Sequence, residues 1–296
     1  MAERRVAAIV VNYNAAPTLA GCVASLRAND VDEVIVVDNG STDGSRAALA
    51  AGDRSARWVP SGGNVGYGRA ANLGAAQVDG ADLLICNPDL VVHNGAVAAL
   101  AKRLDATPTM GVVGPLVRNA DGSLYPSART FPDMADAVGH GLMGMVAPHN
   151  RYTRRYRLLD WDHANASKVD WVSGACFLAR RQAWDEVGGF DPAFFMYMED
   201  VDLCWRVGEA GWSVGYEPAA EVTHLQGVSA NQHPYRMLAA HHASMWRFAR
   251  RTTARSRRAL LPVIGVGLAA RFVVTAAAHR RAVARAGPAA RPTRVP

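Results

Sequence analysis

The chain has 296 residues, 50% of them hydrophobic and 20% charged, with a formal net charge of +6. This length and composition exclude a disordered chain and fit one large α/β domain with appendages. Its four cysteines form no CxxC pair and have no clustered histidines, which excludes a zinc ribbon or a disulfide framework and predicts reduced core thiols in a cytosolic protein. They are Cys22, Cys86, Cys176 and Cys204. The apolar run 6–11 is too short for a signal peptide.

The first third of the chain alternates apolar runs with helical segments. The continuous apolar run 6–11 predicts a strand that helices cover on both faces, and 17–26 predicts the first helix. Residues 34–37 and 83–86 predict further strands, and another begins at 112. This alternation indicates an α/β fold with a mostly parallel sheet, in which ligands bind at the carboxyl ends of the strands.

Two polar loops follow predicted strands. The turn-forming cluster 38–44 comes directly after 34–37, so that Asp38 could accept a hydrogen bond from a base or ribose. The glycine-rich loop 61–69 opens a helix, where close backbone approach and a helix N-terminus favour a diphosphate. Taken alone, such a loop is more typical of a plain turn. It matches neither GxxxxGK[ST] nor GxGxxG, which argues against a nucleoside triphosphatase or a hydride-transfer enzyme.

Asp89 follows the strand at 83–86 and a proline that fixes the turn. A carboxylate there is a candidate ligand for a divalent ion that bridges phosphates. Taken singly, it could equally be a turn aspartate.

Residues 196–206 set three carboxylates in an apolar and aromatic run: Glu199, Asp200 and Asp202. Partial desolvation raises the proton affinity of a carboxylate toward the range of a general base, so this segment predicts an active-site wall. Asp202 and Arg206 have helical i, i+4 spacing, and a buried structural ion pair is an equal alternative for them. Asp200 has no basic residue three or four positions after it, which favours a chemical role.

The C-terminal part of the chain is strongly basic. Thirteen arginines and no Asp, Glu or Lys follow Glu221, which leaves 19 basic and 26 acidic residues before that point and net charges of −7 and +13. The apolar stretch 260–278 is short for a membrane-spanning helix and is interrupted by Arg271, but it suits a lipid interface. We therefore predict a peripheral anchor on an anionic membrane surface rather than a nucleic-acid site. A solvated basic face and a single weak span are the alternatives.

Six segments of the chain fall in an order that resembles the inverting family 2 glycosyltransferases. They are Val37–Gly44, Gly63–Gly68, Asn87–Asp89, Gly174–Leu178, Gly188–Asp191 and Glu199–Asp202. The resemblance covers roughly residues 6–230 and implies a GT-A fold, with a Rossmann-like, mostly parallel sheet and helices on both faces. It also implies a nucleotide-sugar donor and a divalent metal, Mg²⁺ or Mn²⁺.

The resemblance also implies a division of the chain. Residues 1–230 would form the glycosyltransferase domain, with a nucleotide-sugar-binding half at 1–115 and an acceptor-binding half at 116–230. A helical, arginine-rich, membrane-associating region would follow at 231–286, and a disordered tail at 287–296.

Within the family, three narrower segments resemble the actinobacterial rhamnosyltransferases that build the cell-wall arabinogalactan linker: Asp121–Arg129, Phe195–Leu203 and Ala239–Ser244. This implies transfer of L-rhamnose from dTDP-β-L-rhamnose to the 3-hydroxyl of GlcNAc-diphospho-polyprenol, at the cytoplasmic face of the plasma membrane. Transfer of another sugar to a lipid or polysaccharide stays an alternative. A non-catalytic scaffold is a second one, although such a relative should have lost Asp200 or Asp89.

The resemblance further implies a role for each site residue. Asp200 would be the catalytic base and Glu199 would orient the site, while Asp89 and His224 would hold the metal. Donor-binding residues would be Asn12, Asp38, Asn39, Gly66, Arg69, Asn72 and Asn87, and acceptor contacts would come from Arg129 and Asp202. Asn87 departs from the Asp-x-Asp motif of many relatives, which predicts weaker metal binding. The adjacent His241 and His242 predict no second metal site, because neighbours on a helix face different ways.

Overall fold

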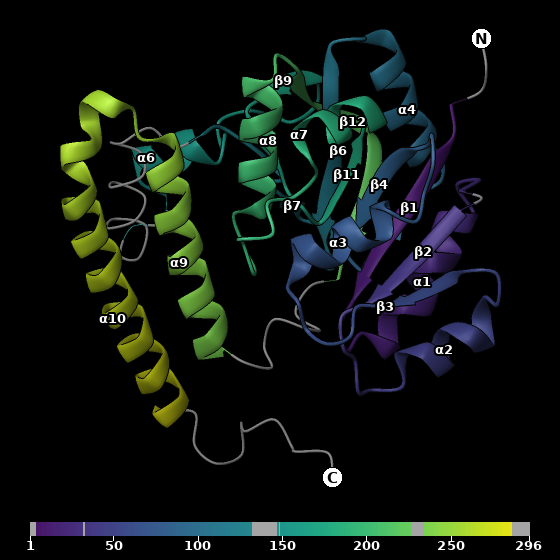
Figure 1. The fold of residues 1–296 in the computed structure, drawn as a ribbon, viewed down its shortest axis with the longest axis horizontal. Helices are drawn as coiled ribbons and strands as arrows, with labels where there is room; N and C mark the ends of the chain where they lie inside the picture. The colour runs from purple at the N-terminus through teal and green to yellow at the C-terminus, as the bar shows by residue number, and fades with distance from the viewer. Residues whose placement is uncertain (1–3, 32, 132–146, 148, 226–233, 286–296) are drawn as a thin grey trace. The chain divides into compact units, whose positions relative to one another are not determined.

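The chain forms two compact units, Met1–Asn231 and Gln232–Pro296. The structure is a computed structural model that describes residues 4–31, 33–131, 147, 149–225 and 234–285. The first unit contains the sheet that positions the candidate site, and the second contains a pair of long helices (Figure 1). The predicted disordered tail at 287–296 lies outside the described residues.

One ten-stranded sheet forms the centre of the first unit, in the order β3-β2-β1-β4-β11-β6-β12-β5, with β7 beside β6 and β9 beside β12. The first strands are parallel, and β11 is antiparallel to β4 and β6, so the predicted mostly parallel sheet is confirmed. The strands are β1 Val6–Asn12, β2 Glu33–Asp38, β3 Arg57–Pro60, β4 Asp82–Cys86, β5 Leu90–Val92, β6 Met110–Asn119, β7 Leu124–Tyr125, β9 Ser167–Val169, β11 Cys176–Ala179 and β12 Ser213–His224. A separate antiparallel pair joins β8 Ala128–Arg129 to β10 Trp171–Val172.

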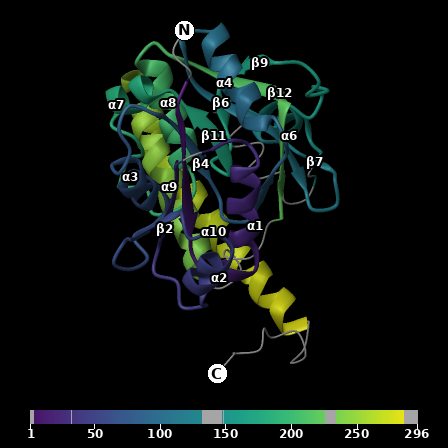
Figure 2. The same cartoon turned by 90° about the vertical axis from the view of Figure 1, so that its right-hand side faces the viewer.

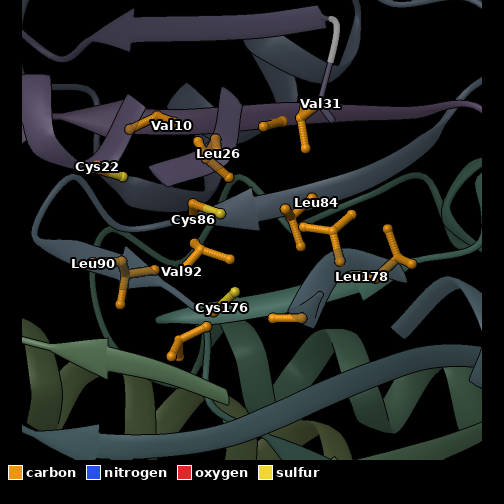
Figure 3. Close-up of a cluster of buried hydrophobic side chains, with 14 of the residues drawn as sticks. Val10, Cys22, Leu26, Val31, Leu84, Cys86, Leu90, Val92, Cys176 and Leu178 are labelled. Carbon is orange, nitrogen blue, oxygen red and sulfur yellow. The ribbon is translucent and has the colours of Figure 1, made fainter. Parts of the chain in front are cut away.

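Helices cover both faces of the sheet (Figures 1 and 2). On one face lie α1 Ala16–Arg27, α2 Ser45–Gly52 and α4 Ala96–Ala106, packed on a core that includes Val10, Leu26 and Leu84 (Figure 3). On the other lie α3 Tyr67–Ala75 and α7 Arg181–Val187, whose aromatic rings surround Phe190. This arrangement explains why the residues of β1 are apolar. Both faces of the strand are covered by helices, so burial of each apolar side chain stabilises the fold.

Two further helices border the site. They are α6 Arg151–Tyr156 and α8 Glu199–Glu209, and α8 packs against α7, β10 and β12. All four cysteines are free and buried, which confirms the predicted core thiols. Three of them, Cys22, Cys86 and Cys176, lie in the hydrophobic cluster of Figure 3.

The second unit is a pair of packed helices, α9 Pro234–Thr252 and α10 Leu261–Arg285, joined through a 3₁₀ turn at Arg255–Leu260. Ring contacts of 5.2 Å between Tyr235 and His279 and of 5.5 Å between His242 and Phe272 show that the helices run antiparallel. Among the described residues, Arg255–Arg281 has the length and apolar composition to cross a membrane. The helix is longer than the apolar stretch 260–278 suggested, so length does not exclude a span.

Candidate functional site

The carboxyl ends of β1 and β2 bring two predicted donor residues together. Asn12 and Asp38 are partners in the parallel register. Asn12 Nδ2 donates to Asp38 Oδ1 at 3.2 Å and to Ser41 Oγ at 2.9 Å. The Oδ1 atom of Asn12 is buried and has no hydrogen-bond partner among the described residues. Because an unpaired buried oxygen costs free energy, this edge favours a polar ligand.

Asn39 links the turn after β2 to the glycine-rich loop. Its Nδ2 donates to Asn64 Oδ1 at 3.2 Å, and its Oδ1 accepts from Val65 N at 2.9 Å. Gly40 next to it has a φ of +87°, and a Cβ there would lie 3.0 Å from backbone atoms of Gly63. The side chain of Asn39 therefore holds two loops together, which fixes the strand edge in advance of any ligand.

The glycine-rich loop lies directly against the segment that leads into α8. Gly66 has a φ of +93°, and a Cβ on it would lie 2.3 Å from Phe195 O, so only glycine fits. At the start of α3, Arg69 Nε donates to Pro192 O at 2.7 Å. One turn further, Asn72 Nδ2 donates to Phe190 O at 2.8 Å and Asn72 Oδ1 accepts from Phe190 N at 3.0 Å. These contacts connect the predicted donor loop to the predicted base.

Asn87, Asp89 and His224 meet beside β5. His224 Nε2 lies 3.1 Å from Asp89 Oδ1 and 3.2 Å from Asn87 Nδ2. These groups come together because β12 ends at His224, antiparallel to β5, in register with Leu90. The two predicted metal ligands are therefore neighbours in space, although 135 residues separate them.

The donor atoms of Asp89 and His224 fit a divalent ion that is shared with a substrate. A carboxylate oxygen and an imidazole nitrogen in contact can bind one ion, and Mg²⁺ commonly takes one or two carboxylates together with substrate phosphates. Within the described ranges, no group of three or more His, Cys, Asp or Glu side chains could hold a metal. The remaining ligands would therefore have to come from phosphate oxygens and water, with Asn87 as a further polar neighbour.

Asp200 is held at the start of α8 by backbone N–H groups. Its Oδ2 accepts from Gly174 N at 2.8 Å and its Oδ1 accepts from Val201 N at 2.9 Å. A Cβ on Gly174 would lie 3.2 Å from Asp200 Cβ, so the close approach depends on glycine. Burial raises the pKa of Asp200, while these hydrogen bonds and the charge of Arg129 oppose the rise. The result is an oriented carboxylate with increased proton affinity.

Glu199 precedes the base and differs from it in environment. Its side chain is buried, and its Oε2 atom has no hydrogen-bond partner among the described residues. Burial and then the negative charge of Asp200 raise the pKa of Glu199 to about 8. At neutral pH Glu199 is therefore mainly protonated. Tyr197 and Met198, just before it, have φ values of 66° and 65°, a strained conformation that often marks functional sites.

Asp202 lies one turn further and has a structural role. It is fully buried, and its Oδ2 accepts from Arg206 Nε at 2.8 Å. Arg206 also donates to the carbonyls of Val187 and Gly189, at 2.6 and 2.7 Å. The ion-pair alternative is therefore the one that the structure shows. We assign Asp202 to the packing of α8 in place of an acceptor contact.

The predicted base and the predicted metal ligands are connected through two adjacent residues, Gly174 and Ala175. Asn87 N donates to Ala175 O at 2.9 Å, and the neighbouring Gly174 N donates to Asp200. The antiparallel register of β4 and β11 sets this connection, since Cys86 faces Cys176. The predicted metal ligands and the predicted base thus adjoin one backbone junction.

Arg129, the other predicted acceptor residue, lies among aromatic rings. Its guanidinium carbon is 4.9 Å from the ring centre of Trp171 and 5.7 Å from those of Tyr125 and Tyr156. The side chains of Tyr125, Tyr156 and Trp171 thus form an aromatic cage around Arg129. They come from β7, α6 and β10, so no sequence spacing could have indicated them. Tyr67 was also missed, although its hydroxyl donates to Gly174 O at 2.8 Å and supports the base.

A doubly covered α/β sheet with a polar strand edge, neighbouring Asp89 and His224 side chains and an oriented carboxylate fits a glycosyltransferase of the GT-A fold. The model of the family described as "Glycosyl transferase family 2" matches residues 7–202, so the chain belongs to this family. The predicted fold class, family and enzyme class are thereby confirmed.

Two curated relatives indicate where the chain stands within the family. It is 39% identical over 253 residues to the N-acetylglucosaminyl-diphospho-decaprenol L-rhamnosyltransferase of Mycobacterium tuberculosis, with 81% of this chain and 82% of that protein covered. It is 28% identical over 172 residues to the rhamnosyltransferase WbbL of Escherichia coli K12, with 55% and 62% covered.

A solved structure supports the fold. The mannosyltransferase PcManGT of Pyrobaculum calidifontis, in complex with GDP-Man and Mn²⁺, matches with a TM-score of 0.56 and 19% identity. The match covers 97% of this chain and 81% of that one. At this identity the likeness shows the shared fold alone.

Proposed function

We propose that the chain transfers L-rhamnose from dTDP-β-L-rhamnose to the 3-hydroxyl of GlcNAc-diphospho-polyprenol, in the biosynthesis of the cell-wall arabinogalactan linker. The mycobacterial relatives named for this sugar and a decaprenol-linked acceptor match four-fifths of the chain. The observation that carries the proposal is the position of Asp200. Its carboxylate accepts a hydrogen bond from Gly174 N. The next residue, Ala175, accepts one from the backbone N–H of Asn87, which lies beside the proposed metal ligands.

The donor would bind along the strand edge. Asp38 accepts from Asn12 through one oxygen, and its other oxygen would accept from the N–H of the thymine ring. Asn39, Gly66, Arg69 and Asn72 would fix the loops around the donor. Asp89 and His224, with Asn87 beside them, would hold a divalent metal, Mg²⁺ or Mn²⁺, which when bound stabilises negative charge on the departing dTDP.

The reaction would be a single in-line displacement with inversion. Asp200 would accept the proton of the acceptor 3-hydroxyl as that oxygen attacks the anomeric carbon, and dTDP would leave on the opposite side. Glu199, protonated beside it, would leave the negative charge of the pair on Asp200. The anchoring N–H groups of Gly174 and Val201 would keep the base aimed at the acceptor.

The test is a transfer assay with a panel of nucleotide sugars and a short-chain GlcNAc-diphospho-lipid, with Mg²⁺ or Mn²⁺ and with chelator. The product mass is the readout. We expect a deoxyhexose increment from dTDP-rhamnose that chelator abolishes. A hexose increment would show that the donor sugar is not rhamnose and would leave the assignment to family 2 glycosyltransferases intact. The absence of any transfer would favour a non-catalytic scaffold.

The α9–α10 pair fits a peripheral anchor on an anionic membrane. Val263, Val266, Val273 and Val274 of α10 are exposed, and the one Arg within 259–279, Arg271, acts electrostatically on His241 of α9. Arginines flank this stretch on both sides: Arg255, Arg257 and Arg258 before, Arg280 and Arg281 after. α9 packs along α10 and contains several Arg and His residues. If α10 crossed the bilayer, α9 would bring these polar side chains into the hydrocarbon core, which is unfavourable. An orientation in the plane of the cytoplasmic leaflet avoids that cost.

Vesicle sedimentation tests this orientation. Val266→Asp with Val273→Asp places two charges on exposed apolar positions of α10, and Ala239→Asp with Ala243→Asp places the same charge on exposed positions of α9. We expect only the first pair to release the protein from anionic vesicles at moderate salt. Equal release by both pairs would indicate simple charge attraction, and resistance of membrane-bound protein to carbonate extraction would indicate a span.

A further inference from the structure

Arg129 is a partly buried cation whose planar face is occupied by the aromatic cage. Trp171 and Tyr156 pack on the guanidinium group, and Tyr125 lies beside it. Arg129 Nε donates to Pro126 O at 2.8 Å and Nη2 donates to the Tyr125 hydroxyl at 3.2 Å. Rings packed around an arginine restrict its orientation. A guanidinium group has five N–H donors, more than these contacts and the hydrogen bond to Tyr156 use.

Among the described residues, no carboxylate forms an ion pair with Arg129, although Asp200 attracts it electrostatically. Arg118, on the neighbouring β6, donates to Glu221 at 2.7 Å, and Arg206 is paired with Asp202. A phosphate would give this partly buried cation a direct, hydrogen-bonded ion pair, which its attraction to Asp200 does not provide. The cage therefore holds Arg129 ready for an anion that binds from outside the protein.

The position of Arg129 indicates which anion this is. Arg129 faces Trp171 in the β8–β10 pair, and the chain continues from β10 to Gly174, whose N–H holds Asp200. Asp200 and Arg129 also act on each other electrostatically, each favouring the charged form of the other. The cation thus lies on the acceptor side of the base, on an element separate from Asp38, Asp89 and His224, which we assigned to the donor.

We propose that Arg129, held by the aromatic cage, binds the diphosphate of the acceptor and so selects an acceptor in which an anion is attached to the reacting sugar. In GlcNAc-diphospho-polyprenol, the first phosphate and the 3-hydroxyl belong to one sugar ring. One cation close to the base can therefore hold the phosphate while the hydroxyl meets Asp200. This inference rests on the proposed function for the identity of the acceptor sugar.

The test compares two acceptors of equal chain length, GlcNAc-diphospho-alkyl and the uncharged alkyl GlcNAc glycoside, with wild type, Arg129→Met and Arg118→Met. Arg118→Met removes the same charge from a neighbouring strand where the arginine already has a partner. For Arg129→Met, we expect KM for the diphospho acceptor to rise roughly 10- to 100-fold, the usual scale for losing a hydrogen-bonded ionic contact. Turnover of the uncharged acceptor should change much less, and Arg118→Met should leave the preference between the two acceptors unaltered.

Other patterns would overturn the inference. An equal loss with both acceptors, together with a shifted pH profile, would show that Arg129 acts only by positioning Asp200. An unchanged KM in Arg129→Met would also reject it. Calorimetric binding of the diphospho acceptor without donor separates this inference from the proposed reaction. If that binding depends on Arg129 but dTDP-rhamnose is not used, the rhamnosyl donor is wrong and the acceptor site stands.

Discussion

The donor edge and the acceptor side of the site satisfy their polar groups in different ways. At the donor edge, Asn39 and Asn72 use their amide groups to bind neighbouring loops, and the edge is fixed by contacts within the protein. On the acceptor side, Glu199 has a buried oxygen without a partner in the described part of the chain, and Arg129 has no ion-paired carboxylate there. The loops of the donor edge are thus fixed in advance, and a ligand is left to satisfy Asn12 Oδ1 there and Glu199 Oε2 on the acceptor side.

This difference indicates where chemistry and specificity reside. An edge whose loops are fixed by contacts within the protein can orient a nucleotide without moving, which lowers the entropic cost of binding. On the acceptor side, an oriented Asp200 beside Glu199 and Arg129 provides charged groups whose interactions with the acceptor can change during the reaction. Substitutions on the acceptor side should therefore affect turnover, while those in the supporting contacts should affect stability.

The largest effect on this comparison is expected from Asp200→Asn. The amide keeps an oxygen for the Gly174 N–H but cannot accept a proton, so kcat should fall roughly 10²- to 10⁴-fold. Donor affinity, measured by calorimetry with the nucleotide sugar, should stay close to that of wild type because the donor edge is separate. Turnover similar to that of wild type would remove Asp200 from the mechanism.

The sequence predicted one region better than the other for a physical reason. Asp38 and Asp89 follow apolar runs, so parallel-sheet geometry predicted polar strand ends at one edge, and the resemblance added Asn12 to them. The aromatic cage could not be predicted this way, because Tyr125, Tyr156 and Trp171 come from three distant elements whose meeting depends on tertiary packing. Asp202 was ambiguous in the sequence, and only its complete burial against Arg206 decided between chemistry and structure.

Asp202→Asn sharpens the contrast between two carboxylates on the same helix. The substitution leaves Arg206 opposite an uncharged amide in a buried pair, and we expect the free energy of unfolding to fall by about 3 kcal/mol. Urea denaturation measures this loss, and kcat of the remaining folded enzyme should change far less than in Asp200→Asn. A large loss of kcat at unchanged stability would restore Asp202 to the acceptor site.

The effect of Glu199→Gln is expected in the pH dependence of stability, and it is smallest at low pH. The pKa of Glu199 is about 8 in the folded state, above the ordinary value of about 4.3 in the unfolded chain. As pH rises between these values, the unfolded state loses a proton that the folded state keeps, so wild-type stability falls across this window. Glutamine imitates the protonated side chain at every pH, which removes this contribution. In urea unfolding at pH 5, 6.5 and 8, the variant should therefore gain stability relative to wild type as pH rises. Parallel curves would mean that Glu199 is ionised in the folded protein, and the acceptor side would then carry a second negative charge that Arg129 would have to balance.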